Sequence, residues 1–121
     1  MEHTRVILPD GHVIEAHVAV TRKEKARGLA GVYQLGATRG MLFPYEEEGY
    51  YPYWMAGCLI PLDIIWMDSG GRVVQVCRDC QPQDIHGSQL YGGEVKARCV
   101  LEIGTGEALK HGVQLGTELK F

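Results

Sequence analysis

The alternation of apolar and polar residues predicts short strands over much of the chain. Residues 5–8 and 12–20 are rich in β-branched and apolar side chains, and the Pro-Asp-Gly turn between them predicts a hairpin. A second hairpin is predicted from residues 62–67 and 72–77, joined by an Asp-Ser-Gly-Gly turn. Residues 96–103 resume the same alternation. The pattern therefore favours a chain built mainly from antiparallel strands.

Two short helices interrupt this pattern. Thr21 stands three residues before Glu24, which is the spacing of a capping box, and residues 22–29 contain good helix formers. A second short helix is predicted over residues 107–111. We therefore expect a single domain spanning residues 1–121, mainly β, folded as a small barrel or roll of short, mostly antiparallel strands with two short helices.

Several segments are expected to end strands or to form loops. Pro44 lacks a backbone N–H, so it should stop the short buried strand at residues 40–43. The three glutamates at residues 46–48 are expected in a solvated loop, because charge runs are usually exposed. Residues 78–94 lose all periodicity and predict one long loop, whereas residues 118–121 predict a closing strand.

Composition and charge exclude few classes of protein. With 121 residues, 45% apolar and 22% charged, the chain has the composition of a folded soluble protein. Its net charge of -3, without a basic stripe, gives no electrostatic support for binding nucleic acid. No apolar run is long enough for a membrane span, and the first residues lack the pattern of an export signal. We expect a cytoplasmic protein, or an exported one if a signal peptide has been removed.

The candidate site lies around the stretch from Tyr53 to Asp68, which holds both tryptophans and the densest apolar run. Asp63 and Glu102 are acidic residues on otherwise apolar strands, and carboxylates beside aromatic rings are typical of sites that handle sugars. A small polar ligand, such as a sugar or an envelope-derived fragment, is therefore the favoured partner. The predicted ligand-binding residues are Arg27, Tyr53, Trp54, Asp63, Trp66 and Glu102.

Other interpretations of these acidic residues stay open. Asp63 could accept backbone N–H groups, while Glu102 could pair with Arg27 or Arg98, because a buried charge must be compensated. A hydrolase would instead use Asp63 and Glu102 together as acid and base. A third interpretation is a structural module that binds a protein partner. The sequence favours a non-catalytic binding or accessory role, and no catalytic residue is assigned.

Four cysteines offer a further candidate feature. Cys77 and Cys80 have the two-residue spacing of redox and zinc motifs, but a loop, rather than a helix, is predicted after them. A closed zinc site would need two more ligands, such as His86 with another cysteine. A disulfide or free thiols are favoured over a metal, and no cofactor is predicted. The histidines show no arrangement typical of a nucleophile, and we assign them no catalysis.

Several ordered motifs resemble a known family. Residues 27–29 read Arg-Gly-Leu, residues 40–43 read Gly-Met-Leu-Phe, and Trp54-Met55 is followed by Ile-Pro-Leu-Asp-Ile-Ile at residues 60–65. Val-Leu-Glu at residues 100–102 then precedes glycines at 106, 112 and 116. In this order, from about Val18 to the C-terminus, the chain resembles the family known as domain of unknown function 192.

The resemblance implies a fold and leaves the function open. Members of that family resemble small β-barrels or rolls with short helices, and many carry export signals or lipid anchors. This sequence departs from the family at three positions. Gly57 and Cys58 stand where asparagine and threonine are common, and Ala30 replaces a common methionine. The family has no established activity to transfer to these residues.

Overall fold

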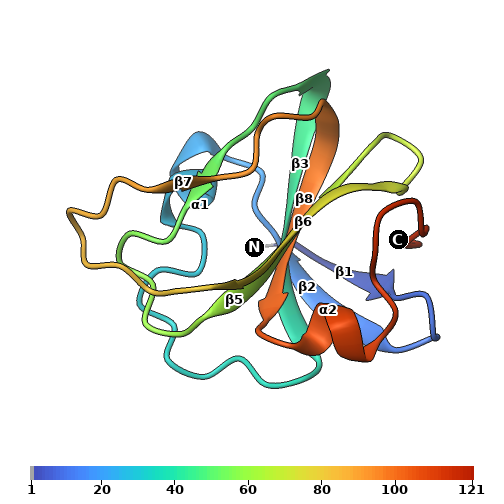
Figure 1. The fold of residues 1–121 in the computed structure, drawn as a ribbon, viewed down its shortest axis with the longest axis horizontal. Helices are drawn as coiled ribbons and strands as arrows, with labels where there is room; N and C mark the ends of the chain where they lie inside the picture. Colours follow the sequence, from blue (N-terminus) through green and yellow to red (C-terminus); the bar gives the residue numbers. More distant parts are fainter. Residues whose placement is uncertain (1) are drawn as a thin grey trace.

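The computed structural model describes residues 2–121 and is mainly β, with two short helices (Figure 1). This confirms the predicted fold class. The strands are β1 (Glu2–Ile7), β2 (Val13–Val18), β3 (Arg39–Gly49), β4 (Tyr53–Trp54), β5 (Leu62–Met67), β6 (Val73–Cys80), β7 (Leu90–Tyr91) and β8 (Ala97–Gly104). The helices are α1 (Arg22–Arg27) and α2 (Glu107–Lys110), and neither of these is long and apolar enough to cross a membrane.

Six strands form the main sheet, in the order β1-β2-β3-β8-β5-β6. Both predicted hairpins, β1–β2 and β5–β6, are present and antiparallel. β2 and β3 pair in parallel because the connection between them crosses over through α1. β4 and β7 form a separate two-stranded sheet beside α1 (Figure 1). The most central strands, β3, β8 and β5, therefore come from distant parts of the sequence.

The C-terminal segment, residues 116–120, joins the two edges of the main sheet. The N–H of Ile7 donates to the carbonyl oxygen of Lys120 over 2.7 Å, and the N–H of Leu119 donates to Gly71 over 2.9 Å. The predicted closing strand is thus a pair of isolated bridges, Ile7 with Lys120 and Arg72 with Glu118. Within residues 2–121 strands β1 and β6 stand at opposite ends of the sheet and do not pair with each other, so the sheet does not close into a barrel.

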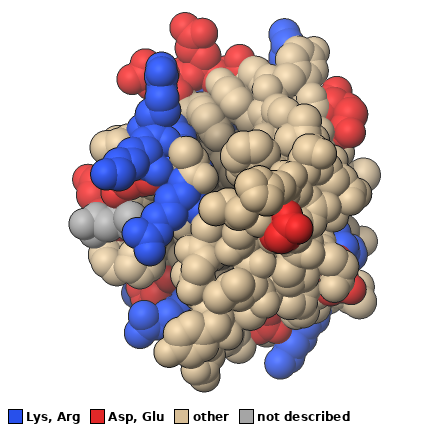
Figure 2. Space-filling model, turned by 90° about the vertical axis from the view of Figure 1, so that its left-hand side faces the viewer, with Lys and Arg blue, Asp and Glu red and all other residues tan. Residues whose placement is uncertain are grey.

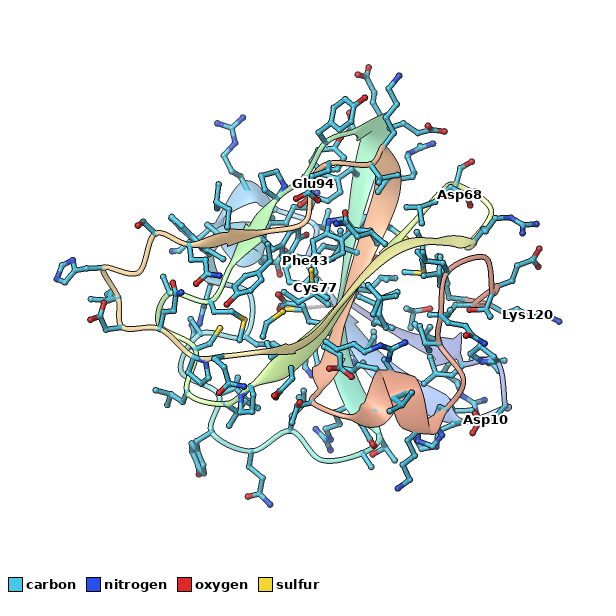
Figure 3. All side chains as sticks on the ribbon, in the orientation of Figure 1. Asp10, Phe43, Asp68, Cys77, Glu94 and Lys120 are labelled. Carbon is cyan, nitrogen blue, oxygen red and sulfur yellow. The ribbon has the colours of Figure 1, made fainter. Side chains whose placement is uncertain are left out.

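The main sheet is packed with side chains on both faces (Figure 3). One face carries a core that includes Ile65 and Leu101 and is covered by Ala108 of α2 and by the C-terminal segment. The other carries a core that includes Phe43 and Trp66. All six residues of β5 are buried for this reason, because neither face of the strand meets water.

Helix α1 begins and ends as its sequence predicts. The Thr21 hydroxyl accepts the N–H of Glu24 over 3.0 Å, and the Glu24 carboxylate accepts the N–H of Thr21 over 2.9 Å. This is the expected capping box. The helix ends at Gly28, whose φ of +52° lies in the left-handed region that favours glycine. The chain then turns toward the sheet, which brings Gly28 close to Phe43 and Glu102.

Three expectations about strand ends and loops are wrong. β3 continues through Pro44 to Gly49 and does not end at the proline. Its pairing with β8 shifts register after Pro44, so the irregular ladder accommodates a residue without a backbone N–H. Glu46, Glu47 and Glu48 are exposed as expected, but they lie on this strand. The predicted long loop at residues 78–94 contains the end of β6 and all of β7, which is too short to show a period.

Candidate functional site

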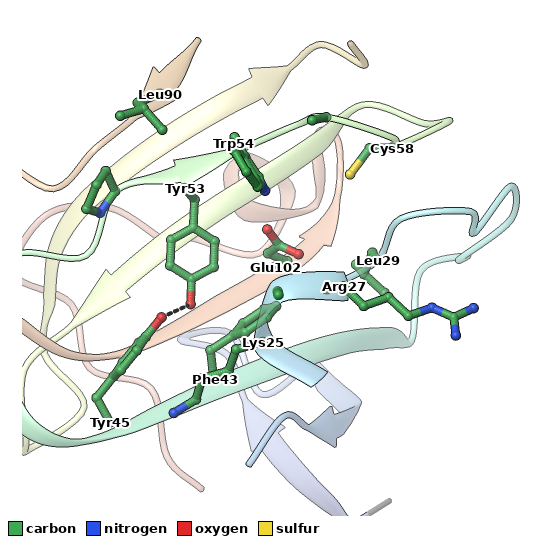
Figure 4. A pocket seen from close by; sticks show the side chains of 14 residues that line it. Lys25, Arg27, Leu29, Phe43, Tyr45, Tyr53, Trp54, Cys58, Leu90 and Glu102 are labelled. Atoms are coloured by element: carbon green, nitrogen blue, oxygen red, sulfur yellow. Dashed lines mark hydrogen bonds between the residues drawn. The ribbon is translucent and has the colours of Figure 1, made fainter. Parts of the chain in front are cut away.

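A pocket of about 300 Å³ lies between α1, β4 and the central strands of the main sheet. This volume is at the small end of the range for ligand-binding pockets. Its lining includes Lys25, Arg27, Tyr53, Trp54, Cys58 and Glu102. Figure 4 shows these side chains arranged around the carboxyl group of Glu102.

Glu102 comes from β8 and is only 3% exposed. Burial raises the pKa of its carboxyl group to about 8, so most of the population is protonated and neutral at pH 7. The Oε1 atom has no hydrogen-bond partner among residues 2–121. A buried polar atom that the protein leaves unsatisfied is uncommon and calls for a water or a ligand.

Gly28 borders this carboxyl group. A Cβ atom at this position would stand 3.7 Å from Glu102 Oε1 and 3.5 Å from Phe43 Cζ. Gly28 therefore combines a backbone conformation that favours glycine with a position beside the pocket. Figure 4 shows Glu102 between Phe43 and Trp54, so the acid lies between aromatic rings.

Aromatic side chains form one wall of the pocket. The hydroxyl groups of Tyr45 and Tyr53 are 2.7 Å apart and hydrogen-bonded, and the ring of Tyr53 packs edge-on against Phe43 at 5.0 Å. Burial raises the pKa of both tyrosines, so both stay neutral. Trp54 is 53% exposed and adds a large apolar ring at the mouth. In this wall Tyr45 and Tyr53 are partly buried and hydrogen-bonded, whereas Trp54 is accessible.

Basic side chains of α1 border the pocket. Lys25 Nζ lies 4.2 Å from the centre of the Tyr45 ring, in the geometry of a cation–π contact. The guanidinium group of Arg27 points away from Glu102 in Figure 4. On the side of the molecule drawn in Figure 2, basic side chains gather along one border of a mostly uncharged surface. The pocket thus combines a neutral acid inside with cations at its edge.

Cys58 also lines the pocket, but it is not an activated nucleophile. Burial, with a smaller contribution from Glu102, raises the pKa of its thiol to about 11. A thiol of this kind stays protonated at neutral pH and is a poor nucleophile. Its side chain contributes to the apolar lining.

Four of the six predicted ligand-binding residues line this pocket, namely Arg27, Tyr53, Trp54 and Glu102. Trp66 and Asp63 lie elsewhere. Trp66 is completely buried, and its Nε1–H donates to the carbonyl oxygen of Tyr51 over 2.8 Å. Trp66 therefore supports the pocket from within the core and offers no surface to a ligand.

Asp63 is a structural residue. Its Oδ1 accepts the N–H of Asp79 over 2.9 Å, and its Oδ2 accepts the N–H of Ala108 over 3.0 Å. It thereby ties β5 to β6 and to the start of α2. The interpretation that Asp63 accepts backbone N–H groups is confirmed. The alternative that Glu102 pairs with Arg27 or Arg98 is wrong, because within residues 2–121 neither arginine forms a salt bridge with Glu102, and Arg98 Nε donates to the carbonyl oxygen of Tyr45 over 2.7 Å.

The strand register separates Asp63 from Glu102. Asp63 pairs with Ile103, while Glu102 pairs with Ile64. Paired residues of antiparallel strands point to the same face, and successive residues point to opposite faces. The two carboxyl groups therefore lie on opposite faces of the sheet, and they cannot act together on one substrate.

Sequence reasoning missed several residues of the pocket. Lys25 and Cys58 gave no distinctive signal, because a lysine on a short helix and a cysteine in a turn are both common. Phe43 was assigned to a buried strand, with no hint that its ring would stand beside Glu102. Tyr45 stands close in sequence to Tyr50, Tyr51 and Tyr53, and this clustering of tyrosines is the signal that could have led to its contact with Tyr53.

All four cysteines, each within residues 2–121, are free thiols. Cys80 Sγ lies 3.7 Å from the carbonyl oxygen of Cys77, and burial raises the pKa of the Cys80 thiol to about 12. Asp79, between them in sequence, has a positive φ of 54° where β6 is irregular. The pair thus occupies a bulged strand end, which differs from the helix N-terminus of a redox motif.

The fold and the pocket define a small, mainly β protein with a ligand-sized cavity whose floor is a buried acid. The chain belongs to the DUF192 family, described as Uncharacterized ACR, COG1430, which matches residues 5–121. This confirms the resemblance seen in the sequence motifs and extends it through the first hairpin.

Two solved structures have the same fold. A protein of unknown function from Novosphingobium aromaticivorans is 28% identical, with a TM-score of 0.89 over 98% of this chain and 85% of that chain. A protein from Sinorhizobium meliloti, described as a candidate transcription regulator, is 26% identical, with a TM-score of 0.86 over 96% of this chain and 89% of that chain. None of the curated proteins compared with the chain matches it.

Proposed function

We propose that the protein is a non-catalytic ligand-binding domain, whose pocket holds a small polyhydroxylated molecule such as a sugar or an envelope-derived fragment. The observation that carries this proposal is Glu102, a buried acid with an unpartnered oxygen in an accessible pocket. Leaving a buried acceptor unpaired costs about 1–3 kcal/mol, which a bound ligand would recover.

The protonation state of Glu102 suits a neutral hydroxyl-bearing ligand. A protonated carboxyl group donates one hydrogen bond through its O–H and accepts through its other oxygen. Neighbouring sugar hydroxyls offer the complementary acceptor and donor. The neutral acid is therefore matched to a hydroxyl-bearing ligand.

The aromatic wall supports the same class of ligand. Trp54 exposes about half of its surface at the mouth, where an apolar ring face of a sugar can stack on the indole. Lys25 and Arg27 stand at the border and add attraction for a ligand that also carries an acidic group. Sugars and sugar acids are thus the first compounds to test.

Neither the hydrolase interpretation nor a direct role in binding DNA finds support in this chain. The hydrolase interpretation needs Asp63 and Glu102 on one substrate, but they face opposite sides of the sheet. The description of the Sinorhizobium meliloti relative suggests a role in transcription. A net charge of -3 weighs against direct binding of this chain to DNA, because affinity for DNA comes largely from neutralising phosphates.

Titration calorimetry with a panel of monosaccharides, sugar acids and short oligosaccharides tests the proposal. We expect saturable binding of at least one compound, weakened at least about tenfold in Trp54→Ala and in Glu102→Leu, which removes both hydrogen-bonding oxygens and keeps a side chain of similar size. Tyr33→Ala removes an aromatic ring that is 79% exposed outside this pocket and is the matched control. Equal affinity in all three variants would refute the proposed site.

A further inference from the structure

Three side chains from opposite ends of the sequence meet beside α2, away from the pocket. His12 follows the turn of the first hairpin, while Glu107 and His111 lie one helical turn apart. One ring nitrogen of each histidine and one carboxylate oxygen of Glu107 lie within 4.8 Å of one another. Figure 3 shows Asp10, the neighbour of His12 in the hairpin turn, on the side of the molecule that holds α2.

Two of these ligand atoms are buried and unsatisfied. Within the described chain, His111 Nε2 and Glu107 Oε1 have no hydrogen-bond partner, although His111 is only 8% exposed. The two atoms are 3.9 Å apart, which is too long for a hydrogen bond to each other. At this separation a single shared partner would satisfy both atoms.

In each histidine, one ring nitrogen lies within hydrogen-bond distance of an oxygen acceptor. His111 Nδ1 lies 2.7 Å from Asp10 Oδ2, and His12 Nε2 lies 2.6 Å from the carbonyl oxygen of Ala37. Each acceptor fixes an N–H at that nitrogen, so a neutral ring keeps its lone pair on the other one. A carboxylate or carbonyl behind a histidine is the arrangement that supports metal-binding imidazoles.

We propose that His12, Glu107 and His111 bind a divalent transition-metal ion, and that the donor set suits Zn²⁺. Two imidazole nitrogens and one carboxylate oxygen are a known set of three protein ligands for zinc, which keeps a fourth position for water. Carboxylate-rich sites that lack histidine suit Mg²⁺ or Ca²⁺ better. Asp10 and Ala37 orient the ligands without contacting the ion.

Binding requires a small local adjustment. The two imidazole rings are stacked, with centroids 3.8 Å apart and planes within 4° of parallel. Lone pairs of parallel rings do not converge, so one ring must tilt for both nitrogens to reach the ~2.0–2.1 Å of a zinc bond. His12 is the ring that can move, because it is less buried than His111 and can pivot about its hydrogen bond to the carbonyl oxygen of Ala37. The ion would then fasten the N-terminal hairpin to α2.

Calorimetric titration of Zn²⁺ into chelator-treated, tag-free protein tests this site, with Co²⁺ absorption spectra as a second readout. We expect one ion per chain and a tetrahedral Co²⁺ spectrum. Affinity should fall about 10–100-fold in Asp10→Asn, where only a supporting group changes, and further in His12→Ala and Glu107→Gln. Thermal melts without metal verify that each variant is folded.

A second histidine pair provides the matched control. The rings of His3 and His17 lie 4.1 Å apart on the first hairpin and could hold an ion adventitiously. Unchanged Zn²⁺ affinity in His17→Ala, together with loss in His12→Ala, supports the proposed site. Loss in His17→Ala with retention in His12→Ala and Glu107→Gln, or no binding by the wild-type chain, would overturn it.

Discussion

At the scale of single residues, two buried acids on adjacent strands have opposite roles. Asp63 satisfies two backbone N–H groups and holds the fold together. Glu102 has an oxygen in an accessible pocket that no group of residues 2–121 pairs with. Their sequence contexts are alike, since each acid interrupts an apolar strand. Their hydrogen-bond partners alone distinguish the structural acid from the candidate binding group.

Glu102 makes stability fall with rising pH. The folded protein binds this proton more tightly than the unfolded chain does, because burial raises the pKa from 4.5 to about 8. The contribution of this carboxyl group to the free energy of unfolding is therefore fully present below pH 4.5 and is lost as the pH rises through about 8. Glu102→Gln stays neutral, so it should be more stable than wild type by about 3–5 kcal/mol at pH 9 and similar at pH 5.

Urea denaturation of both proteins across this pH range measures the effect. The difference between the two curves isolates Glu102 from the other titrating groups. Parallel curves for wild type and Glu102→Gln would show that the carboxyl group is not held neutral by burial.

Replacing Asp63 should cost stability and leave the pocket intact. Asp63→Ala leaves the N–H groups of Asp79 and Ala108 without an acceptor, and we expect the free energy of unfolding to fall by about 2–4 kcal/mol. Asp63→Asn keeps one acceptor oxygen and should cost less. Glu46→Ala removes an exposed carboxylate and serves as the control in the same denaturation series. An unchanged free energy of unfolding in Asp63→Ala would contradict the structural role.

At the scale of elements, α1 sets one side of the pocket through its two ends. The capping box fixes where the helix begins, and Gly28 fixes where it ends beside Glu102. Lys25 and Arg27 are placed at the border by the same short helix. A helix of six residues has little stability of its own, so its caps matter more than its interior.

Thr21→Ala should therefore destabilise helix α1. Loss of the side-chain acceptor for the Glu24 N–H is expected to cost about 1 kcal/mol. Thr21→Ser keeps the hydroxyl and should be close to wild type. Thermal melts measure the stability, and hydrogen exchange at residues 22–28 should increase in the alanine variant alone. Equal exchange in both variants would mean that the cap does not hold α1.

Local patterns were enough to predict several elements. Turn residues and alternation predicted the two hairpins, and side-chain spacing predicted the capping box of α1. They failed where pairing with a distant strand decides the structure. β3 runs through Pro44 because β8 tolerates a register shift, and β7 exists only because β4 is there to pair with it. The opposite orientation of Asp63 and Glu102 likewise follows from register between strands.

At the scale of the whole molecule, the two candidate sites lie in different parts of one curved sheet. The pocket opens between α1 and β4, whereas the histidine cluster joins the first hairpin to α2. The segment at residues 116–120 links the sheet edges and belongs to neither site. Mutations in the pocket should therefore change ligand binding without changing metal binding, and mutations in the histidine cluster should do the reverse. Each proposal can thus be tested independently of the other.

The two tryptophans provide the most direct test of the pocket. Trp54 is half exposed at its mouth, whereas the Trp66 indole N–H is buried in a hydrogen bond to Tyr51. Proton–nitrogen correlation spectra recorded during titration with sugars and sugar acids follow both indole signals at once. We expect the Trp54 signal and the backbone signal of Gly28 to shift saturably, while the Trp66 indole signal stays in place. Absence of any saturable shift, or shifts confined to other parts of the molecule, would contradict a ligand-binding role for this pocket.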